Sequence, residues 1–119
     1  MKKLLILIAV ISLSFSAYAQ EQNSESMKKV VVARLSIKSD KADQFLQAAE
    51  KIVKETRKEA GCEIYTLYKS CFGPENEFIF YEEYKDQKAL DFHNNSAYLE
   101  EFFSAITPLL DGAPVVEVF

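Results

Sequence analysis

The stretch from Glu77 to Tyr84 constrains the fold of this chain more than any other part of it. Phe78 and Phe80 fall on one face of a strand of period two. Ile79 and Tyr81 fall on the opposite face, so both faces carry large apolar side chains. Because helices packed on a sheet cover only one of its faces, a monomer would leave the other apolar face in water. We expect a homodimer in which a second copy covers that face, with a lipid or an extended hydrophobic ligand as the alternative.

Two further strands and a long helix are predicted before this stretch. Residues 29–37 (KVVVARLSI) and 62–68 (CEIYTLY) alternate in the same way. Between them, apolar positions from Ala42 to Ala60 recur with the 3.6-residue period of an amphipathic helix. The Ser39-Asp40 pair is placed to cap this helix, and Gly61 is placed to end it. A short turn containing glycine and proline then joins the second and third strands into a hairpin.

Helical segments and a last strand are predicted after the stretch. Asp86 opens a short helix that carries His93, and Ser96 caps a second helical segment. The turn at residues 111–114 leads into a strand at residues 115–119. The predicted order is β-α-β-β-α-β, the ferredoxin-like arrangement of an α+β domain. Such a domain has a four-stranded antiparallel sheet with its helices on one face.

The first nineteen residues are predicted to be a secretory signal peptide. Two lysines precede an apolar run from Leu4 to Phe15, and Ala17-Tyr18-Ala19 supplies the small-x-small pattern of a cleavage site. We expect cleavage after Ala19 and a periplasmic or secreted protein that has no membrane contact after cleavage. An uncleaved anchor is the alternative.

The rest of the chain is predicted to be one domain behind a short leader. Residues 20–28 are polar without periodicity and are expected to be disordered, and residues 29–119 form the domain. Loss of the two lysines of the signal peptide changes the formal net charge from −4 to −6 (−4 − 2). Because the sequence has no Lys/Arg cluster, nucleic acids and anionic membrane surfaces are not expected partners.

The two cysteines and the single histidine limit the disulfide and metal chemistry of the chain. Cys62 and Cys71 lie nine residues apart on or beside one predicted strand, which corresponds to about 30 Å of extended chain. Bridged cysteines need Cα atoms within about 7 Å, so we expect two reduced and largely buried thiols unless the strand breaks near Lys69. Two cysteines and one distant histidine match no usual metal-ligand spacing, and the sequence has no phosphate-binding loop. We therefore expect no metal and no cofactor.

His93 and Glu82 are the candidates for proton chemistry. His93 would be structural if its ring held the short helix to the strand through Glu82 or a backbone carbonyl. Alternatively, it is a base or hydrogen-bond partner that lines a cavity between helix and sheet. Glu82 follows Phe80 on the same face of its strand, where a buried carboxylate needs a partner. Paired with His93 it would be structural or tune the imidazole, whereas in a cavity it would have a raised pKa and accept a proton.

Several aromatic side chains are predicted to form either a core or a pocket. These candidates for substrate binding are Tyr65, Phe80, Tyr84 and Tyr98. Their spacing is what strand alternation and the helical period produce, so they suit a core or a dimer interface. The walls of a pocket for a planar aromatic substrate would use the same side chains. Residue type does not separate these two possibilities.

Two groups of residues resemble the antibiotic biosynthesis monooxygenase family. Glu59-Ala60-Gly61-Cys62, with Tyr65 three residues later, is similar to the E-x-G-C-x-x-Y start of that family's second strand. The pattern Phe78-x-Phe80-x-Glu82-x-Tyr84-x-Asp86, followed by Ala89-Leu90, His93 and Ser96, is similar to its third strand and following helix. The resemblance covers residues 29–103, and it depends on the order and spacing of these pieces together.

The resemblance implies a dimeric ferredoxin-like α+β barrel. For members similar to quinol monooxygenases, it implies oxidation of an electron-rich phenol or quinol by O2 without metal or flavin. The matching positions imply that His93 and Glu82 are proton acceptors and that Tyr65 and Tyr84 are pocket walls. The haem-degrading relatives carry a haem-ligating histidine where this chain has Phe103, so haem degradation is not expected. We expect a cofactor-independent monooxygenase acting on a quinol-like or polyphenolic aromatic. The alternatives are a non-catalytic dimeric module that binds a small hydrophobic ligand and a structural dimer without a ligand.

Overall fold

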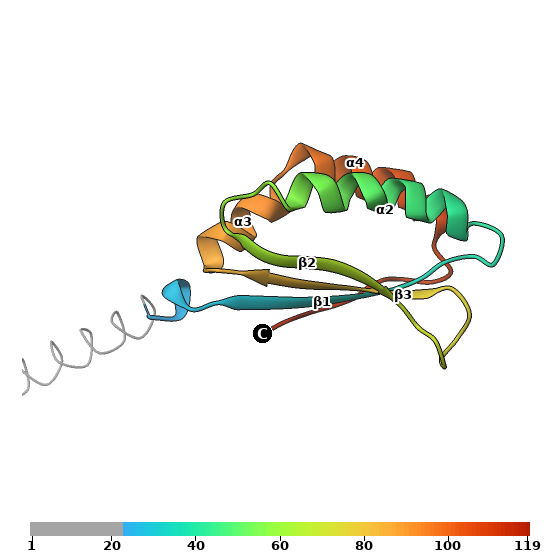
Figure 1. Ribbon diagram of the computed structural model, residues 1–119, viewed down its shortest axis with the longest axis horizontal. Helices are drawn as coiled ribbons and strands as arrows, with labels where there is room; N and C mark the ends of the chain where they lie inside the picture. Colours follow the sequence, from blue (N-terminus) through green and yellow to red (C-terminus); the bar gives the residue numbers. More distant parts are fainter. Residues whose placement is uncertain (1–22) are drawn as a thin grey trace, which may run out of the picture.

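A four-stranded antiparallel sheet carries its helices on one face in this computed structural model, which describes residues 23–119 (Figure 1). The strands are β1 (Lys29–Ser36), β2 (Cys62–Lys69), β3 (Glu77–Tyr84) and β4 (Val115–Val118), in the order β2-β3-β1-β4. A helical turn at residues 23–26 precedes β1. The helices that pack on the sheet are α2 (Ala42–Thr56), α3 (Gln87–Asn94) and α4 (Ala97–Ile106), followed by the short 3₁₀ helix η1 (Thr107–Leu109). The predicted ferredoxin-like order of elements is confirmed. The predicted signal peptide lies outside the described residues.

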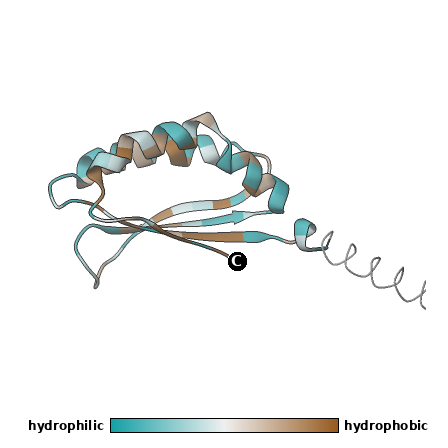
Figure 2. Ribbon diagram, turned by 180° about the vertical axis from the view of Figure 1, so that it is seen from behind, coloured by the Kyte–Doolittle hydropathy of each residue, from teal (hydrophilic) through white to brown (hydrophobic). Residues whose placement is uncertain are grey.

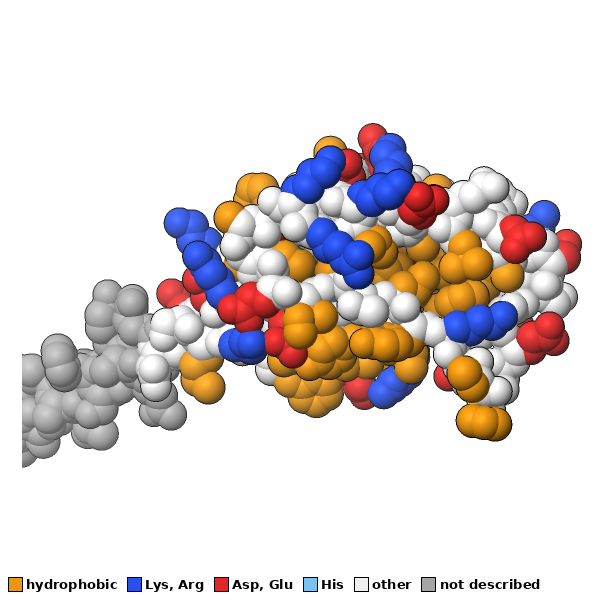
Figure 3. Space-filling view, viewed as in Figure 1, with side chains coloured by type: hydrophobic (Ala, Val, Ile, Leu, Met, Phe, Trp, Pro, Cys, Tyr) orange, Lys and Arg blue, Asp and Glu red, His pale blue; other side chains and the backbone are white. Residues whose placement is uncertain are grey.

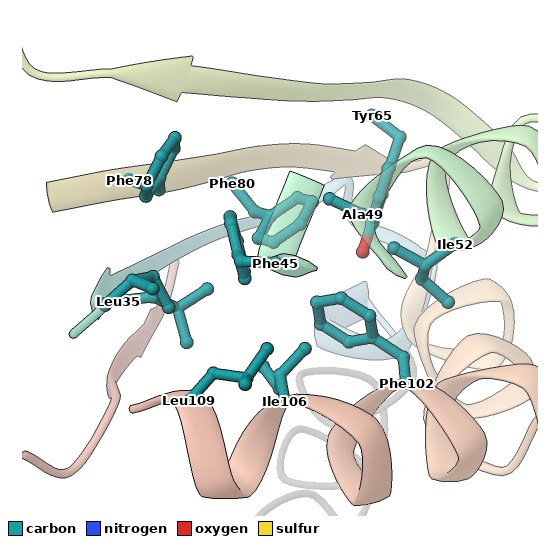
Figure 4. Packing of buried hydrophobic residues seen from close by; sticks show 11 residues of the cluster. Leu35, Phe45, Ala49, Ile52, Tyr65, Phe78, Phe80, Phe102, Ile106 and Leu109 are labelled. Atoms are coloured by element: carbon teal, nitrogen blue, oxygen red, sulfur yellow. The ribbon is translucent and has the colours of Figure 1, made fainter. Parts of the chain in front are cut away.

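The main core lies between the helices and the inner face of the sheet. Phe78 and Phe80 of β3 point into it, as their alternation predicts, and Phe45 of α2 meets both rings at centroid distances of 4.7 and 6.5 Å. Phe102 of α4 closes the group at 6.3 Å from Phe45 (Figure 4). Burying each such side chain is worth roughly 1.5–3 kcal/mol, so these aromatic contacts are the main force that holds α2 and α4 on the sheet.

Helix α2 begins later and ends earlier than the sequence predicts. Its N-cap is Lys41, which makes no side-chain capping bond, so the predicted cap at Ser39-Asp40 is wrong. The Lys41 N–H instead donates to the Lys38 carbonyl, and this turn delays the start of the helix. At the other end, residues 58 and 59 donate to carbonyls only three residues back, so the chain tightens into a turn before Gly61. Glu59 lies in this turn and is buried.

Strand β2 departs from strict alternation near its start. A register shift between Cys62 and Ile64 places Cys62 opposite Tyr84 of β3, where it packs against the core. Burial raises the pKa of the Cys62 thiol to about 11. Both cysteines are free, as expected. Cys71 is exposed because β2 ends at Lys69, the break at which the expectation of buried thiols was not to hold.

Helices α3 and α4 begin at the predicted caps. The Asp86 carboxylate accepts from the Ala89 N–H at 2.8 Å, and the Ser96 hydroxyl accepts from the Leu99 N–H at 3.4 Å. Helix α3 approaches the turn after α2 so closely that a Cβ on Gly61 would lie 2.4 Å from the Ala89 Cβ. Only glycine therefore permits this contact. On α4, Phe102 and Ile106 are buried, whereas Phe103 is exposed.

The outer face of the sheet, opposite the helices, carries apolar side chains in contact with water. Ile64 and Tyr68 of β2 are 39% and 54% exposed, and Val115 on the edge strand β4 is 53% exposed. Hydrophobic side chains gather below the sheet in Figure 3, and Figure 2 shows the largely hydrophobic strand that leads to the C-terminus. Within residues 23–119, the helices are too short or too polar to cross a membrane.

Candidate functional site

Buried polar side chains gather where α3 and the end of α2 meet the sheet, beside the aromatic core. The polar cluster consists of Thr56, Glu59, Tyr65, Glu82, Tyr84, His93 and Tyr98. Its members come from α2, the turn after it, β2, β3, α3 and α4, so only the folded chain brings them together. The cluster thus holds two carboxyl groups and one imidazole that are almost completely removed from water.

Glu59 holds His93 in place within the polar cluster. The His93 Nδ1 atom lies 2.9 Å from Glu59 Oε1, and both side chains are 3% exposed. The Tyr98 hydroxyl from α4 donates to the same oxygen, and burial together with this bond raises the pKa of Tyr98 to about 12. Glu59 Oε2 is buried and has no hydrogen-bond partner among the described residues. The carboxylate therefore orients the imidazole through one oxygen and retains an unfilled acceptor on the other.

Glu82 is a buried carboxyl group with a raised pKa. Burial raises the pKa of Glu82 to about 7, and the nearby carboxylate of Glu59 adds to this rise. The Tyr84 hydroxyl donates to Glu82 Oε2 at 2.8 Å, which partly opposes the shift. Burial and the neighbouring Glu82 raise the pKa of Tyr84 far above its ordinary value, so Tyr84 stays a neutral donor. A carboxyl group with a pKa near 7 can both take up and release protons close to neutral pH.

Tyr65 and Phe80 form the aromatic wall between the polar cluster and the core. Their ring centroids are 5.3 Å apart, and the Tyr65 ring lies 5.5 Å from the His93 ring. Tyr84 faces His93 as well, at 5.2 Å. The Tyr65 hydroxyl points from β2 toward the helices (Figure 4), and burial raises its pKa far above the ordinary value. These rings pack against one another and the imidazole, so their use as pocket walls stays a prediction.

The structure brings most of the predicted site residues together but changes one pairing. His93, Glu82, Tyr65, Tyr84 and Tyr98 share the polar cluster, while Phe80 lies at its border with the core. The predicted partner of His93 was Glu82 or a backbone carbonyl, and its observed carboxylate partner is Glu59.

Sequence reasoning assigned no role to Glu59, although Glu59 opens the Glu59-Ala60-Gly61-Cys62 motif. That motif was the sequence signal that could have identified Glu59 as a member of the site. Within residues 23–119, no three His, Cys, Asp or Glu residues are grouped so that they could hold a metal ion.

Comparisons with known proteins agree with this architecture. The antibiotic biosynthesis monooxygenase family model matches residues 29–105. YcnE of Bacillus subtilis, named as a candidate monooxygenase, is 35% identical over 83 residues, which cover 70% of this chain and 86% of that protein. Rv0793 of Mycobacterium tuberculosis, named in the same way, is 30% identical over 88 residues, which cover 74% of this chain and 85% of that protein.

Solved structures show the same fold. The crystal structure of a candidate antibiotic biosynthesis monooxygenase from Caulobacter crescentus matches with a TM-score of 0.77 at 27% identity, over 85% of this chain and 95% of that one. The structure of Rv0793 matches with a TM-score of 0.72 at 28% identity, over 77% of this chain and 92% of that one. By the extent of these matches, this chain belongs to the antibiotic biosynthesis monooxygenase family.

Proposed function

We propose that this protein is a homodimeric, cofactor-independent monooxygenase that oxidises a quinol-like or polyphenolic aromatic substrate with O2. Membership of the family supports a monooxygenase. The observation that carries the proposal is the polar cluster, in which Glu82 has a pKa of about 7 and His93 is held by Glu59. A proton acceptor inside an aromatic, nearly dry environment is what the oxidation of a phenol by O2 requires.

The proposed reaction draws its electrons from the substrate itself. Removal of a hydroxyl proton from a hydroquinone leaves an electron-rich phenolate, which passes one electron to O2 and yields an aryloxyl radical and superoxide. These combine at a ring carbon that bears hydrogen, and protonation gives a hydroperoxide. Loss of the C–H proton and cleavage of the O–O bond release water and leave a carbonyl. Hydroquinone and O2 thus become a hydroxyquinone and water, and each product contains one of the two atoms of O2.

The residues of the polar cluster take separate roles in this proposal. Glu82 accepts the hydroxyl proton and later returns it to the peroxide. His93 donates through Nδ1 to Glu59, which leaves its Nε2 as a hydrogen-bond acceptor for a hydroxyl group of the substrate. Tyr84 orients Glu82 through its hydroxyl. Tyr65, Phe80 and Tyr98 surround these groups and limit the access of water.

Oxygen uptake with a panel of hydroquinones tests the proposal. We expect His93→Ala and Glu82→Gln each to lower kcat/KM by about 100-fold, the lower range for the loss of a proton-transfer group. Glu83→Gln is the matched control, because Glu83 lies on the other face of β3 and bonds Tyr81 and Lys28. Wild-type activity should rise with pH through about 7, where Glu82 becomes ionised. The absence of oxidation, or equal rates in wild type and both cluster variants, would overturn the proposal.

A non-catalytic binding module is the second candidate function. Tyr65, Phe80 and Tyr84 are almost fully buried and pack against one another and His93, as they would in a structural core. Such a module would bind a hydrophobic ligand without consuming oxygen. Binding of hydroquinones under air with no oxygen uptake would favour this second candidate over the monooxygenase.

A further inference from the structure

A pocket of about 370 Å³ opens beside the polar cluster, between the turn after α2 and the first turns of α3. It is lined by Glu59, Ala60, Gly61, Lys85, Asp86, Lys88, Ala89 and Phe92. Phe92 is 65% exposed, so a large aromatic ring stands in water at this pocket. Pockets of 300–1,000 Å³ that combine apolar walls with a few polar groups are the size and kind that bind small molecules.

Glu59 connects this pocket to the polar cluster. It forms part of the pocket wall, while its Oε1 atom already accepts from His93 and Tyr98. Its Oε2 atom has no donor among the described residues. A buried carboxylate oxygen without a donor is unfavourable, because its hydrogen bonds to water are lost on folding and no hydrogen bond within the protein replaces them. A ligand in the pocket that carries a hydroxyl group could supply the missing donor.

We infer that this pocket is a binding subsite for a neutral phenol, with the ring against Phe92 and Ala89 and the hydroxyl donating to Glu59 Oε2. The inference rests on the proposed function for the choice of a phenol. It adds a subsite at the turn after α2, beside the polar cluster in which Tyr65, Phe80 and Tyr84 pack against one another and His93. Because Oε2 is shielded in the free protein, binding requires the Glu59 side chain to shift toward the pocket.

The pocket also explains why the ligand should be a neutral phenol. A carboxylic acid would bring a second negative charge against Glu59, which is disfavoured at close range. A hydrocarbon of the same shape would contact Phe92 but would leave Glu59 Oε2 unfilled.

A pair of matched ligands tests this inference by NMR titration of the tag-free protein under nitrogen. The ligands are 2-naphthol and 2-methylnaphthalene, which differ in one hydroxyl. We expect both to shift the backbone amides of Gly61, Ala89 and Phe92. The single histidine gives one imidazole Cε1–H signal, and only 2-naphthol should shift it, because only the hydroxyl moves Glu59. We expect 2-naphthol to bind about tenfold more tightly than 2-methylnaphthalene, because one hydrogen bond to a charged group changes the affinity by about this factor.

Variants separate the two parts of the site. Phe92→Ala should weaken both ligands by severalfold, whereas Phe103→Ala, which removes an exposed ring from α4, should change neither. Glu59→Gln should abolish the preference for naphthol, since the amide nitrogen turned toward the pocket donates instead of accepting. Because Glu59 is buried, Glu59→Gln could disturb the fold. In that case the comparison of Phe92→Ala with Phe103→Ala still tests the inference.

The outcomes distinguish this inference from the proposed function. Failure of both ligands to bind, or shifts confined to the outer face of the sheet, would overturn the inference. Binding as predicted, combined with no oxygen uptake from any hydroquinone, would leave the inference standing and defeat the monooxygenase. Oxidation that depends on His93 but keeps the same KM in Phe92→Ala would support the monooxygenase and remove this pocket from it.

Discussion

Glu82 carries an electrostatic effect that links the candidate site to the stability of the fold. Its pKa is raised by burial from 4.5 to about 7 in the folded protein. Between these two values the folded protein holds a proton that the unfolded chain has already lost. The contribution of Glu82 to the free energy of unfolding is therefore fully present below pH 4.5 and is lost as the pH rises through about 7. The direction is opposite to that of a carboxylate in an ion pair.

Glu82→Gln should remove this pH dependence. Glutamine keeps an oxygen that can accept from the Tyr84 hydroxyl but cannot ionise. We expect the wild type to lose up to about 3 kcal/mol of unfolding free energy between pH 4.5 and 8, and the variant to lose much less. Urea unfolding at several pH values measures this, with Glu83→Gln as the control that should keep the wild-type slope. Parallel curves for wild type and Glu82→Gln would contradict the role of burial.

Individual residues show where sequence reasoning succeeds and fails. His93 and Glu82 could be selected because a lone histidine and an inward carboxylate stand out in an apolar pattern. Their pairing could not, because the partner of His93 is Glu59, which is 34 residues away in the chain. Glu59 looks like one more acid at a charged helix end, and its burial follows only from the way the turn after α2 docks on α3. Periodicity does not report such contacts.

Helix α3 is the element that presents His93, and it is short. It spans eight residues, fewer than an isolated helix needs to be stable in water. Its order depends on the Asp86 cap, on the contact of Ala89 with Gly61, and on the hydrogen bond between His93 and Glu59. Loss of any one of these contacts should loosen the imidazole as well as the helix.

Substitution of the caps tests this dependence. Asp86→Ala should lower the free energy of unfolding by about 1 kcal/mol, because it removes the acceptor for the Ala89 N–H. Asp86→Asn should restore most of the loss, since asparagine caps helices well. Ser39→Ala is the control and should stay within about 0.5 kcal/mol, because the cap of α2 is Lys41 and makes no side-chain bond. Equal losses at Ser39 and Asp86 would show that the cap of α3 has no special role. Chemical denaturation measures all three variants.

Elements were predicted well where a local pattern decides them. The bounds of β3 and the caps at Asp86 and Ser96 follow from alternation and from side chains that bond their own backbone neighbours. The end of α2 was predicted less well, because an apolar pattern continued to Ala60 while the chain had already turned. Local propensity favoured more helix, and the docking of Glu59 beneath α3 overrode it.

The whole molecule exposes an apolar sheet face that supports the proposed homodimer. Ile64 and Tyr68 of β2 are exposed on this face, and Val115 adds to it at the edge strand β4. Exposed apolar patches of this kind mark interfaces in soluble proteins. Association of two copies through this face would remove these side chains from water and leave the helices of both copies outside. The dimer and the export of the protein both stay predictions.

Charge substitution on the outer face tests the dimer. We expect a wild-type solution mass of twice that of one chain, and a single-chain mass for Tyr68→Lys combined with Ile64→Lys, because two charges would be buried without partners. Leu46→Lys is the matched control, since Leu46 is 42% exposed on α2 in the helix layer. Light scattering or sedimentation reports the mass. A monomeric wild type would refute the dimer, and a dimeric double variant would exclude this face as its interface.

The sequence by itself determined the order of the elements, the inner face of β3 and the presence of His93 and Glu82 near one end of the sheet. These follow from periodicity and caps, which are local properties of neighbouring residues. Only the tertiary structure decided that Glu59 holds His93, that Glu82 bonds Tyr84 with a pKa near 7, and that Gly61 lets α3 close over the turn. Pairing, burial and close approach depend on residues far apart in the chain, and no local pattern contains them.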